Sequence, residues 1–388
     1  MTPAARAAAA IEILDAVIEA ARSGGAAADT LVQRYFSVRR YAGSKDRRAV
    51  RELVFAVIRA LGEVPESGRA ALIGYLRAHA PEGLTLFGSG GHAPAALSAG
   101  EPEAQPGLAP DWLMARLRAR FGAAAAAQAE ALLGRAPLDL RVNRLKADRD
   151  QLLGEIEGAE ALPHTGDAVR LASGVNVETL PAWQDGLVEV QDAGSQIAAR
   201  AVAARPGETI LDLCAGAGGK TLALAADMRN QGRLIATDTD RGRLSAMPAR
   251  LTRAGVTIAM PRLLDGGREA AALADLEGAC DAVLVDAPCS GSGTWRRNPE
   301  ARWRLTPARL ERLCAEQARL LALAASCVRP GGRLVHVVCS LLPEEGPEQA
   351  ARLLAARADF AADSPEMLLT PHDDDCDGFS IARMRRIG

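Results

Sequence analysis

The stretch from Thr209 to Thr221 reads TILDLCAGAGGKT and decides the fold of the carboxyl-terminal half of the chain. An apolar run leads into a glycine-rich turn, and the turn opens a segment with helical periodicity. Glycines allow a ligand to approach the backbone at a helix start, where the first N–H groups are unpaired. The stretch therefore predicts a strand, a ligand-binding turn and a helix.

The same order of strand and helix recurs after residue 188. The apolar runs GRLIATD, DAVLVD and GRLVHVVCS alternate with helical segments, the longest of which covers 307–328. This alternation is typical of a doubly wound, mostly parallel sheet, in which ligands bind at the carboxyl ends of the strands. We expect an α/β, Rossmann-like domain over residues 186–388.

Three kinds of nucleotide ligand compete for the glycine-rich turn. A phosphate-binding loop needs G-x-x-x-x-G-K-[ST], and its first glycine would fall on Cys214. The dinucleotide pattern G-x-G-x-x-G starting at Gly216 would place its third glycine on Thr221. Both patterns fail, so an adenosyl ligand without a pyrophosphate remains. Asp238, at the end of the next strand, can accept hydrogen bonds from both hydroxyls of its ribose.

The rest of the chain divides into three further segments. Residues 1–82 carry apolar side chains at helical spacing and predict an all-α bundle. Residues 83–110 are rich in Gly, Pro, Ala and Ser and predict a linker. Residues 111–185 mix helical segments with short strand-like runs such as LDLRVNRL, which indicates a small α+β module. We therefore expect a multidomain chain.

Composition limits the class of protein. The chain has 388 residues, 48% of them hydrophobic, and a formal net charge of -2. No run of about 20 apolar residues could span a membrane, and the first twenty residues lack the pattern of an export signal. The seven cysteines form no C-x-x-C pair, so neither a disulfide framework nor a zinc site is indicated. We expect a cytoplasmic protein that binds no membrane and no metal.

Basic residues concentrate in two stretches. Between Arg34 and Arg51, seven basic residues stand against one acid, Asp46. Between Arg296 and Arg319, seven arginines stand against three glutamates. A solvated helical face is the commoner explanation of such runs. Because basic side chains also supply most of the affinity for phosphate backbones, both runs are candidates for nucleic-acid contact.

One aspartate and two cysteines stand at predicted strand ends. Asp286 ends the run DAVLVD and is followed by a proline-stiffened loop with Cys289, which places the aspartate to hydrogen-bond a planar base or an amide. Cys339 ends the next run, VHVVCS. A lone cysteine at a strand end is more often a small buried apolar residue than a nucleophile. Two cysteines at neighbouring strand ends, beside a predicted cofactor loop, favour a catalytic role.

Four motifs, in this order and spacing, carry a resemblance to a known family: ILDLCAGAGGKT, VQDAGSQ, DAPCSGSGTWRRNPEARW and VVCSLLPEE. They resemble the RNA cytosine-C5 methyltransferases of the Nol/Nop/Sun family. The amino-terminal sequence AGSKDRRAVRELVFAVIRAL is similar to the NusB-like RNA-binding domain of the bacterial RsmB (Sun) branch. The resemblance implies that the chain, acting as a monomer, uses S-adenosyl-L-methionine to methylate carbon 5 of a cytosine in 16S rRNA.

The resemblance also implies a role for each site residue. Cys339 would attack carbon 6 of the cytosine as a thiolate, which makes carbon 5 able to take the methyl group. Cys289 would assist proton removal and product release, and Asp286 would hold the base. Lys220 would order the active-site acids. The residues expected to line the cofactor are Cys214, Ala215, Gly216, Ala217, Gly218, Gly219, Lys220, Asp238, Asp265 and Asp286. The residues expected to contact RNA are Arg47, Arg48, Arg51, Arg296 and Arg297.

Two alternatives remain open. The same chemistry could act on another RNA, such as transfer RNA. The chain could also be an RNA-binding assembly factor that has lost activity, because the family commonly has Thr where this chain has Val338. A DNA cytosine methyltransferase fits less well, since that class has its nucleophile in the Pro-Cys loop and would not need Cys339.

Overall fold

The computed structural model describes residues 1–163 and 165–388. It divides into two compact units. The helical unit contains residues 1–135 and 294–309, and the sheet unit contains residues 136–293 and 310–388. The segment 294–309 therefore belongs to the helical unit, although it lies inside the stretch predicted as the α/β domain. The domain limits expected from the sequence, at residues 82, 110 and 185, stay predictions.

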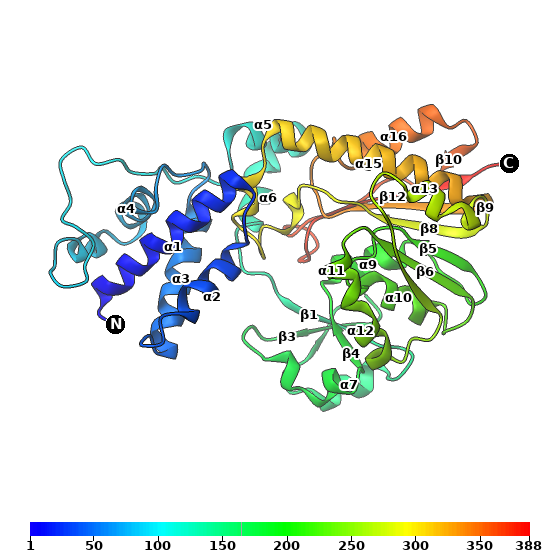
Figure 1. Cartoon of the computed structure of the whole chain (residues 1–388), viewed down its shortest axis with the longest axis horizontal. Helices are drawn as coiled ribbons and strands as arrows, with labels where there is room; N and C mark the ends of the chain where they lie inside the picture. Colours follow the sequence, from blue (N-terminus) through cyan, green and yellow to red (C-terminus); the bar gives the residue numbers. More distant parts are fainter. Residues whose placement is uncertain (164) are drawn as a thin grey trace. The chain divides into compact units, whose positions relative to one another are not determined.

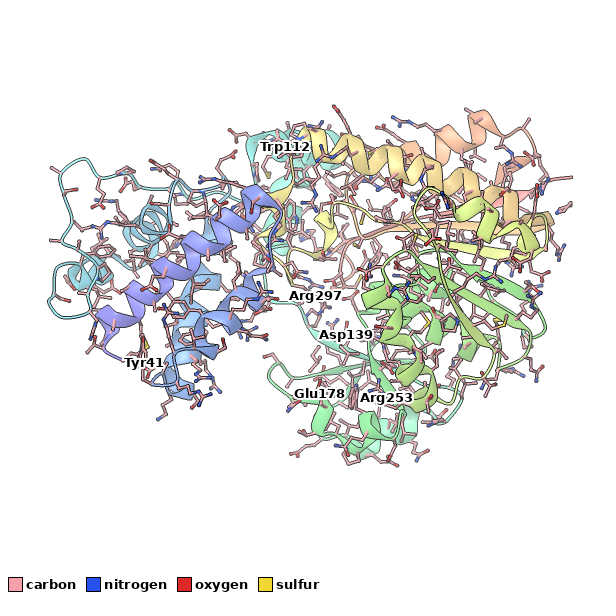
Figure 2. All side chains as sticks on the ribbon, viewed as in Figure 1. Tyr41, Trp112, Asp139, Glu178, Arg253 and Arg297 are labelled. Atoms are coloured by element: carbon pink, nitrogen blue, oxygen red, sulfur yellow. The ribbon has the colours of Figure 1, made fainter. Side chains whose placement is uncertain are left out.

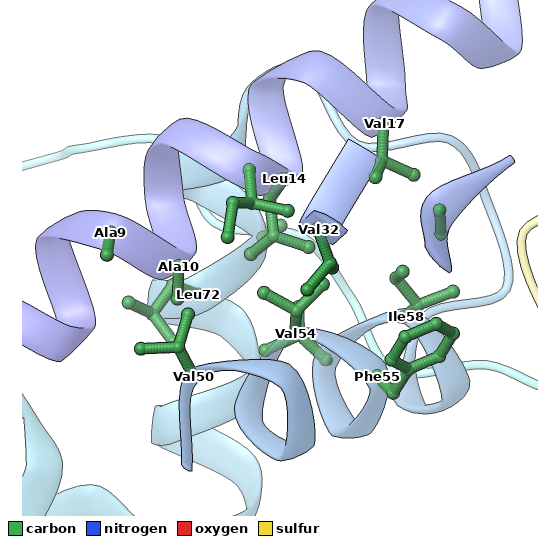
Figure 3. Packing of buried hydrophobic residues seen from close by; sticks show 14 of the residues in the cluster. Ala9, Ala10, Leu14, Val17, Val32, Val50, Val54, Phe55, Ile58 and Leu72 are labelled. Atoms are coloured by element: carbon green, nitrogen blue, oxygen red, sulfur yellow. The ribbon is translucent and has the colours of Figure 1, made fainter. Parts of the chain in front are cut away.

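Buried apolar side chains on one face of each long helix hold the helical unit together. Leu14, Val54, Ile58 and Leu72 are buried in one core (Figure 3). The sequence predicts this core through apolar residues spaced three and four apart. The helices are α1 (Pro3–Ser23), α2 (Ala28–Ser37), α3 (Ser44–Ala60), α4 (Gly68–His79), η1 (Pro81–Leu86), α5 (Asp111–Phe121), η2 (Gly122–Ala124), α6 (Ala125–Ala131) and α14 (Ala301–Arg304).

The stretch predicted as a linker is bound to the helical unit. Ala104 N donates to Ala70 O at 3.0 Å, and Gly107 N donates to Ala60 O at 2.9 Å. Gly74 lies so close to this stretch that a Cβ built on it would approach Ala104 O to 1.9 Å. Although its composition is that of a linker, part of this segment packs directly against α3 and α4.

Arg302 ties segment 294–309 to the helices of its own unit. Its guanidinium, in a residue that is 0% exposed, donates to Ile58 O at 2.6 Å and to Leu61 O at 2.9 Å. Trp303 Nε1 also donates to Leu61 O, at 3.1 Å. Arg302 and Trp303 thus supply buried hydrogen bonds to backbone carbonyls at the end of α3, where Ile58 O also accepts from Leu61 N at 3.5 Å. The common explanation of a basic run, a solvated face, therefore does not hold for Arg302, because charge patterning cannot reveal hydrogen bonds to a distant part of the chain.

The sheet unit begins with a four-stranded antiparallel sheet in the order β2-β3-β1-β4. Leu140, Leu152, Val169 and Val188 lie in its buried apolar cluster. The short strand-like runs predict this sheet, whereas α5 and α6, which the prediction placed in the same module, belong to the helical unit. The elements of the sheet and its connections are β1 (Leu138–Val142), α7 (Arg149–Glu155), β2 (Glu160–Ala161), β3 (Ala168–Leu171), η3 (Val177–Thr179), α8 (Pro181–Gln184) and β4 (Val188–Val190).

An eight-stranded sheet forms the rest of the unit, in the order β10-β12-β9-β8-β5-β6-β7, with β11 paired to β12 (Figure 1). The strands from β9 to β7 in this order are parallel, and β12 runs antiparallel to β9. The Rossmann-like fold class is therefore confirmed. The strands are β5 (Thr209–Asp212), β6 (Arg233–Asp238), β7 (Ala259–Leu263), β8 (Cys280–Asp286), β9 (Val328–Val338), β10 (Phe360–Ala362), β11 (Met367–Leu369) and β12 (Phe379–Arg386).

Helices cover both faces of this sheet (Figure 1). Side chains alternate along each strand, so Leu284 faces a cluster with Leu224 of α10, whereas Val283 and Val285 face a cluster with Leu321 of α15. Such double burial requires the near-continuous apolar strands seen in the sequence. The helices are α9 (Ala193–Arg200), α10 (Gly219–Asp227), α11 (Arg241–Ser245), α12 (Met247–Ala254), α13 (Glu269–Ala272), η4 (Ala274–Leu276), α15 (Pro307–Cys327) and α16 (Pro347–Ala356), with the short turn η5 (Ser292–Thr294) after β8.

Candidate active site

The carboxyl ends of four adjacent strands bring the predicted site residues together. The strand order reverses at the β5/β8 pair, since β6 and β7 lie beyond β5 while β9 and β12 lie beyond β8. Ligands of doubly wound sheets bind at such a switch point. Asp212, Asp238 and Asp286 are the last residues of β5, β6 and β8, and Cys339 follows β9.

The glycine-rich turn connects β5 to α10. Gly216 and Gly218 have φ of 56° and 87°, in the left-handed region that favours glycine. Gly216 N donates to Asp238 Oδ2 at 2.7 Å. Among the described residues, a Cβ built on Gly219 would meet no atom within 4 Å, so the start of α10 faces open space. The turn thus offers a ligand the N-terminus of a helix and a carboxylate at the same place.

Asp212 is fully buried at the end of β5. Thr221 Oγ1 donates to its Oδ2 at 2.7 Å, whereas its Oδ1 has no hydrogen-bond partner within the described part of the chain. Burial raises the pKa of Asp212 to about 7. This residue was missing from the predicted site, although an acid inside an apolar strand-like run is itself a signal.

Lys220, on the first turn of α10, reaches across to the end of β8. Its Nζ lies 2.7 Å from Asp286 Oδ2 and 5.4 Å from the centre of the Phe379 ring. Burial alone would lower the pKa of Lys220, but the charge and hydrogen bond of Asp286 outweigh it and raise the pKa. Lys220 therefore stays cationic beside Asp286.

The two predicted cysteines are in contact. Cys289 Sγ lies 3.3 Å from Cys339 Sγ. The hydrogen bond with Cys339, together with burial, holds the pKa of the Cys289 thiol well above its usual range. Burial also raises the pKa of Cys214 far above its usual range, which makes that residue a poor nucleophile. The sheet therefore brings one protonated thiol against a second sulfur.

Backbone hydrogen bonds hold the loops of the two cysteines in register. Gly293 N donates to Cys339 O at 3.0 Å, and Ala287 N donates to Val337 O at 2.9 Å. Val338 points the other way, into the buried cluster that contains Val285. A threonine hydroxyl at position 338 would lie in that apolar core.

The remaining predicted cofactor residues lie around the turn and at the end of β7. Ala215 N donates to Thr237 O at 2.8 Å, and Ala217 O accepts from Arg250 at 2.8 Å. Asp265 follows β7 and is exposed. Leu264 N donates to Asp238 O at 2.9 Å, which joins the end of β7 to that of β6.

The predicted RNA-contacting arginines belong to the helical unit. Arg47, Arg48 and Arg51 are exposed on α3, where Arg51 pairs with Asp29 at 2.8 Å. By contrast, Arg296 is only 5% exposed. Arg297, labelled in Figure 2, is half-buried.

Within residues 1–163 and 165–388, no group of three or more His, Cys, Asp or Glu side chains could hold a metal ion. In the same residues, no helix has the length and apolar character needed to cross a bilayer.

Comparison with known proteins gives matches over most of the chain. Residues 199–385 match the family described as 16S rRNA methyltransferase RsmB/F, and residues 109–178 match the ferredoxin-like domain of RsmF/B-like methyltransferases. A protein of Enterobacter sp. (strain 638) named ribosomal RNA small subunit methyltransferase B is 36% identical over 287 residues. That match covers 71% of this chain and 66% of the relative.

Two solved structures are similar as well. A methyltransferase homolog protein from Pyrococcus horikoshii has a TM-score of 0.64 at 28% identity, over 72% of this chain and 96% of that one. The protein PH0851 has a TM-score of 0.79 at 24% identity, over 100% of this chain and 99% of that one, which supports the fold.

The switch-point site lies in a Rossmann-like domain, and the family match over residues 199–385 gives that domain its class, the methyltransferases. The chain belongs to the RsmB/F family of methyltransferases. Its match spans 66% of the length of the curated relative, slightly less than two thirds.

Proposed function

We propose that this protein uses S-adenosyl-L-methionine to methylate carbon 5 of a cytosine in small-subunit (16S) rRNA. The observation that carries the proposal is the 3.3 Å contact between the Cys289 and Cys339 sulfurs beside the Lys220–Asp286 ion pair. Carbon 5 of cytosine is a poor nucleophile until a thiolate adds to carbon 6, so this reaction needs thiols where methylation of an amino group does not. The family description and the relative's name support rRNA as the substrate.

The charges at the strand ends suit a cationic adenosyl ligand. Asp212, Asp238 and Asp286 end three adjacent strands, and Lys220 is already paired with Asp286. Carboxylates attract a sulfonium and an ammonium group but repel a triphosphate. Asp238 would hold the ribose hydroxyls, and the buried Oδ1 of Asp212, unpartnered among the described residues, would accept a hydrogen bond from the ligand. When bound, S-adenosylmethionine supplies an electrophilic methyl group.

Three residues of the chain would have separate roles toward the base. Asp286, held by Lys220 at 2.7 Å, would bind the N3 and amino edge of the cytosine. Cys339 would add to carbon 6 as a thiolate, after which carbon 5 takes the methyl group. Cys289 would assist removal of the carbon 5 proton. The bond between carbon 6 and Cys339 then breaks, which restores the carbon 5–carbon 6 double bond and frees the enzyme.

The turn between α2 and α3 is the surface that we propose for RNA contact. Arg40, Lys45 and Arg48 are basic residues of this turn and of the start of α3, with no hydrogen bond or ion pair to any described residue. Tyr41, labelled in Figure 2, is 72% exposed between them. Free cations bind phosphates, and an exposed aromatic ring can stack on an unpaired base. Arg47 and Arg51 lie on the same helix and would extend this surface.

Methylation of defined RNAs tests the proposal. Purified protein and S-adenosylmethionine are incubated with 16S rRNA or with transfer RNA, and bisulfite sequencing then locates 5-methylcytosine. We expect one modified cytosine in 16S rRNA, and loss of the same mark from cells that lack the gene. If only transfer RNA is modified, the substrate is transfer RNA and not 16S rRNA. Absence of methylation from both RNAs, by protein that still binds RNA, would favour an assembly factor instead.

A further inference from the structure

Glu345 is a fully buried carboxylate that lies in the loop after β9. Its Oε1 accepts hydrogen bonds from Ser290 N at 2.7 Å and from Gln317 Nε2 at 3.1 Å. Its Oε2 accepts from Ser340 Oγ at 2.5 Å and from the hydroxyl of Ser290. Four donors thus satisfy one carboxylate in a place where an unpartnered charge would be strongly unfavourable.

The donors come from both cysteine loops. Ser290 directly follows Cys289, and Ser340 directly follows Cys339. Gln317, on α15, donates in addition to Pro288 O at 2.9 Å, on the other side of Cys289. One carboxylate therefore binds the residue that directly follows each thiol.

We propose that Glu345 is a positioning residue that holds the Cys289 and Cys339 thiols in contact through Ser290 and Ser340. The proposal rests on the proposed function, because it assigns Glu345 a part in the same reaction. Each thiol must reach a different atom of one cytosine, and a displacement of about 1 Å at a reacting group can cost about 100-fold in rate.

The charge of Glu345 adds a second effect. The groups whose charges act on the Cys289 thiol are Cys339 and Glu345, and both raise the pKa of Cys289, after the larger effects of the Cys339 hydrogen bond and of burial. The Cys339 thiolate and Lys220 attract each other, which contributes to the raised pKa of Lys220. Glu345 thus favours the protonated thiol at Cys289.

Three variants separate position from charge. Glu345→Gln removes the charge but keeps the size of the side chain. A Ser290→Ala, Ser340→Ala double variant keeps the charge but removes the two hydroxyl groups that donate hydrogen bonds to it. Glu348→Gln is the matched control, because Glu348 is an acid three residues away whose side chain is 50% exposed. Circular dichroism and thermal unfolding establish that each variant is folded.

Two readouts are measured on the full chain. The first is the kcat and KM for methylation of 16S rRNA. The second is the rate at which iodoacetamide alkylates Cys289, followed by mass spectrometry as a function of pH without RNA. We expect the double serine variant to lower kcat about 100-fold with KM within about threefold of the parent protein. We expect Glu345→Gln to lower kcat and to move the midpoint of Cys289 alkylation about one pH unit downward.

The proposal is overturned if both variants match Glu348→Gln in kcat and in the alkylation profile. It is also overturned if the losses follow unfolding alone, with normal kcat per folded molecule. If the parent protein methylates no RNA, only the proposed function fails. The alkylation measurement needs no RNA, so an unchanged midpoint in Glu345→Gln would refute the charge effect in that case too.

Discussion

His336 makes the fold of this protein sensitive to acid, and replacing it tests that sensitivity. The residue lies in β9, is 1% exposed, and has no hydrogen-bond partner for either ring nitrogen among the described residues. Burial lowers the pKa of His336 to about 4. The imidazole is therefore neutral in the folded chain, whereas in the unfolded chain it takes up a proton below a pKa of about 6.5.

The pKa difference sets the size of the effect. Between pH 6.5 and 4 the unfolded chain binds more protons than the folded chain, so stability falls as the pH falls. With pKa values of about 6.5 unfolded and about 4 folded, the loss is about 2 kcal/mol on going from pH 7.5 to pH 5, and about 3 kcal/mol well below pH 4. Asp212 acts in the opposite direction, because its pKa is raised to about 7. The effect of His336 must therefore be measured as a difference between variants.

Urea unfolding at pH 7.5, 6 and 5 gives that difference. The unfolding free energy of His336→Leu minus that of the parent protein should rise by about 2 kcal/mol on going from pH 7.5 to pH 5. His372→Gln is the control, since the His372 side chain is 47% exposed, and it should leave the pH dependence unchanged. The reasoning is refuted if the parent protein and His336→Leu lose stability in parallel as the pH falls.

Three further predictions concern the ligand, the RNA and the helical unit. Asp238→Ala should weaken S-adenosylhomocysteine binding by about 1–3 kcal/mol in calorimetry, through lost hydrogen bonds, and ATP binding that equals cofactor binding would contradict the site assignment. Replacing Arg40, Lys45 and Arg48 with Ala should reduce the slope of log affinity for single-stranded RNA against log salt by about two, and an unchanged slope would make this turn ordinary solvated surface. Arg302→Met should cost about 2–4 kcal/mol in thermal unfolding, because it removes the buried hydrogen bonds of Arg302 to three carbonyls at the end of α3, and an unchanged Tm would show that these bonds are dispensable.

Features that depend on local sequence could be predicted. Apolar runs give the strands, and because parallel strands end at one edge of the sheet, the order of the motifs was enough to group Asp238, Asp286, Cys289 and Cys339. The glycine turn at Gly216 could be predicted from local sequence too, since positive φ favours glycine.

Features that depend on contacts across the chain could not be predicted. Arg302 has the sequence surroundings of a charged surface, but it caps α3 from more than 200 residues away. Glu345 belongs to an acidic pair typical of exposed loops, and only the folded loops bring Ser290 to it. Arg296 is buried, whereas the arginines of α3 that are predicted to contact RNA are exposed, and counting charges in the sequence cannot distinguish the two cases.

The formation of covalent enzyme–RNA complexes by the two cysteine variants tests the central claim most directly. Cys339→Ser and Cys289→Ser are each incubated with 16S rRNA and S-adenosylmethionine, and adducts are resolved on denaturing gels. We predict that Cys339→Ser neither methylates nor forms an adduct, because a serine hydroxyl is scarcely ionised near neutral pH. We predict that Cys289→Ser accumulates an adduct whose release is impaired. An adduct with Cys339→Ser and none with Cys289→Ser would make Cys289 the nucleophile, and full activity of both variants would remove cysteine catalysis from the mechanism.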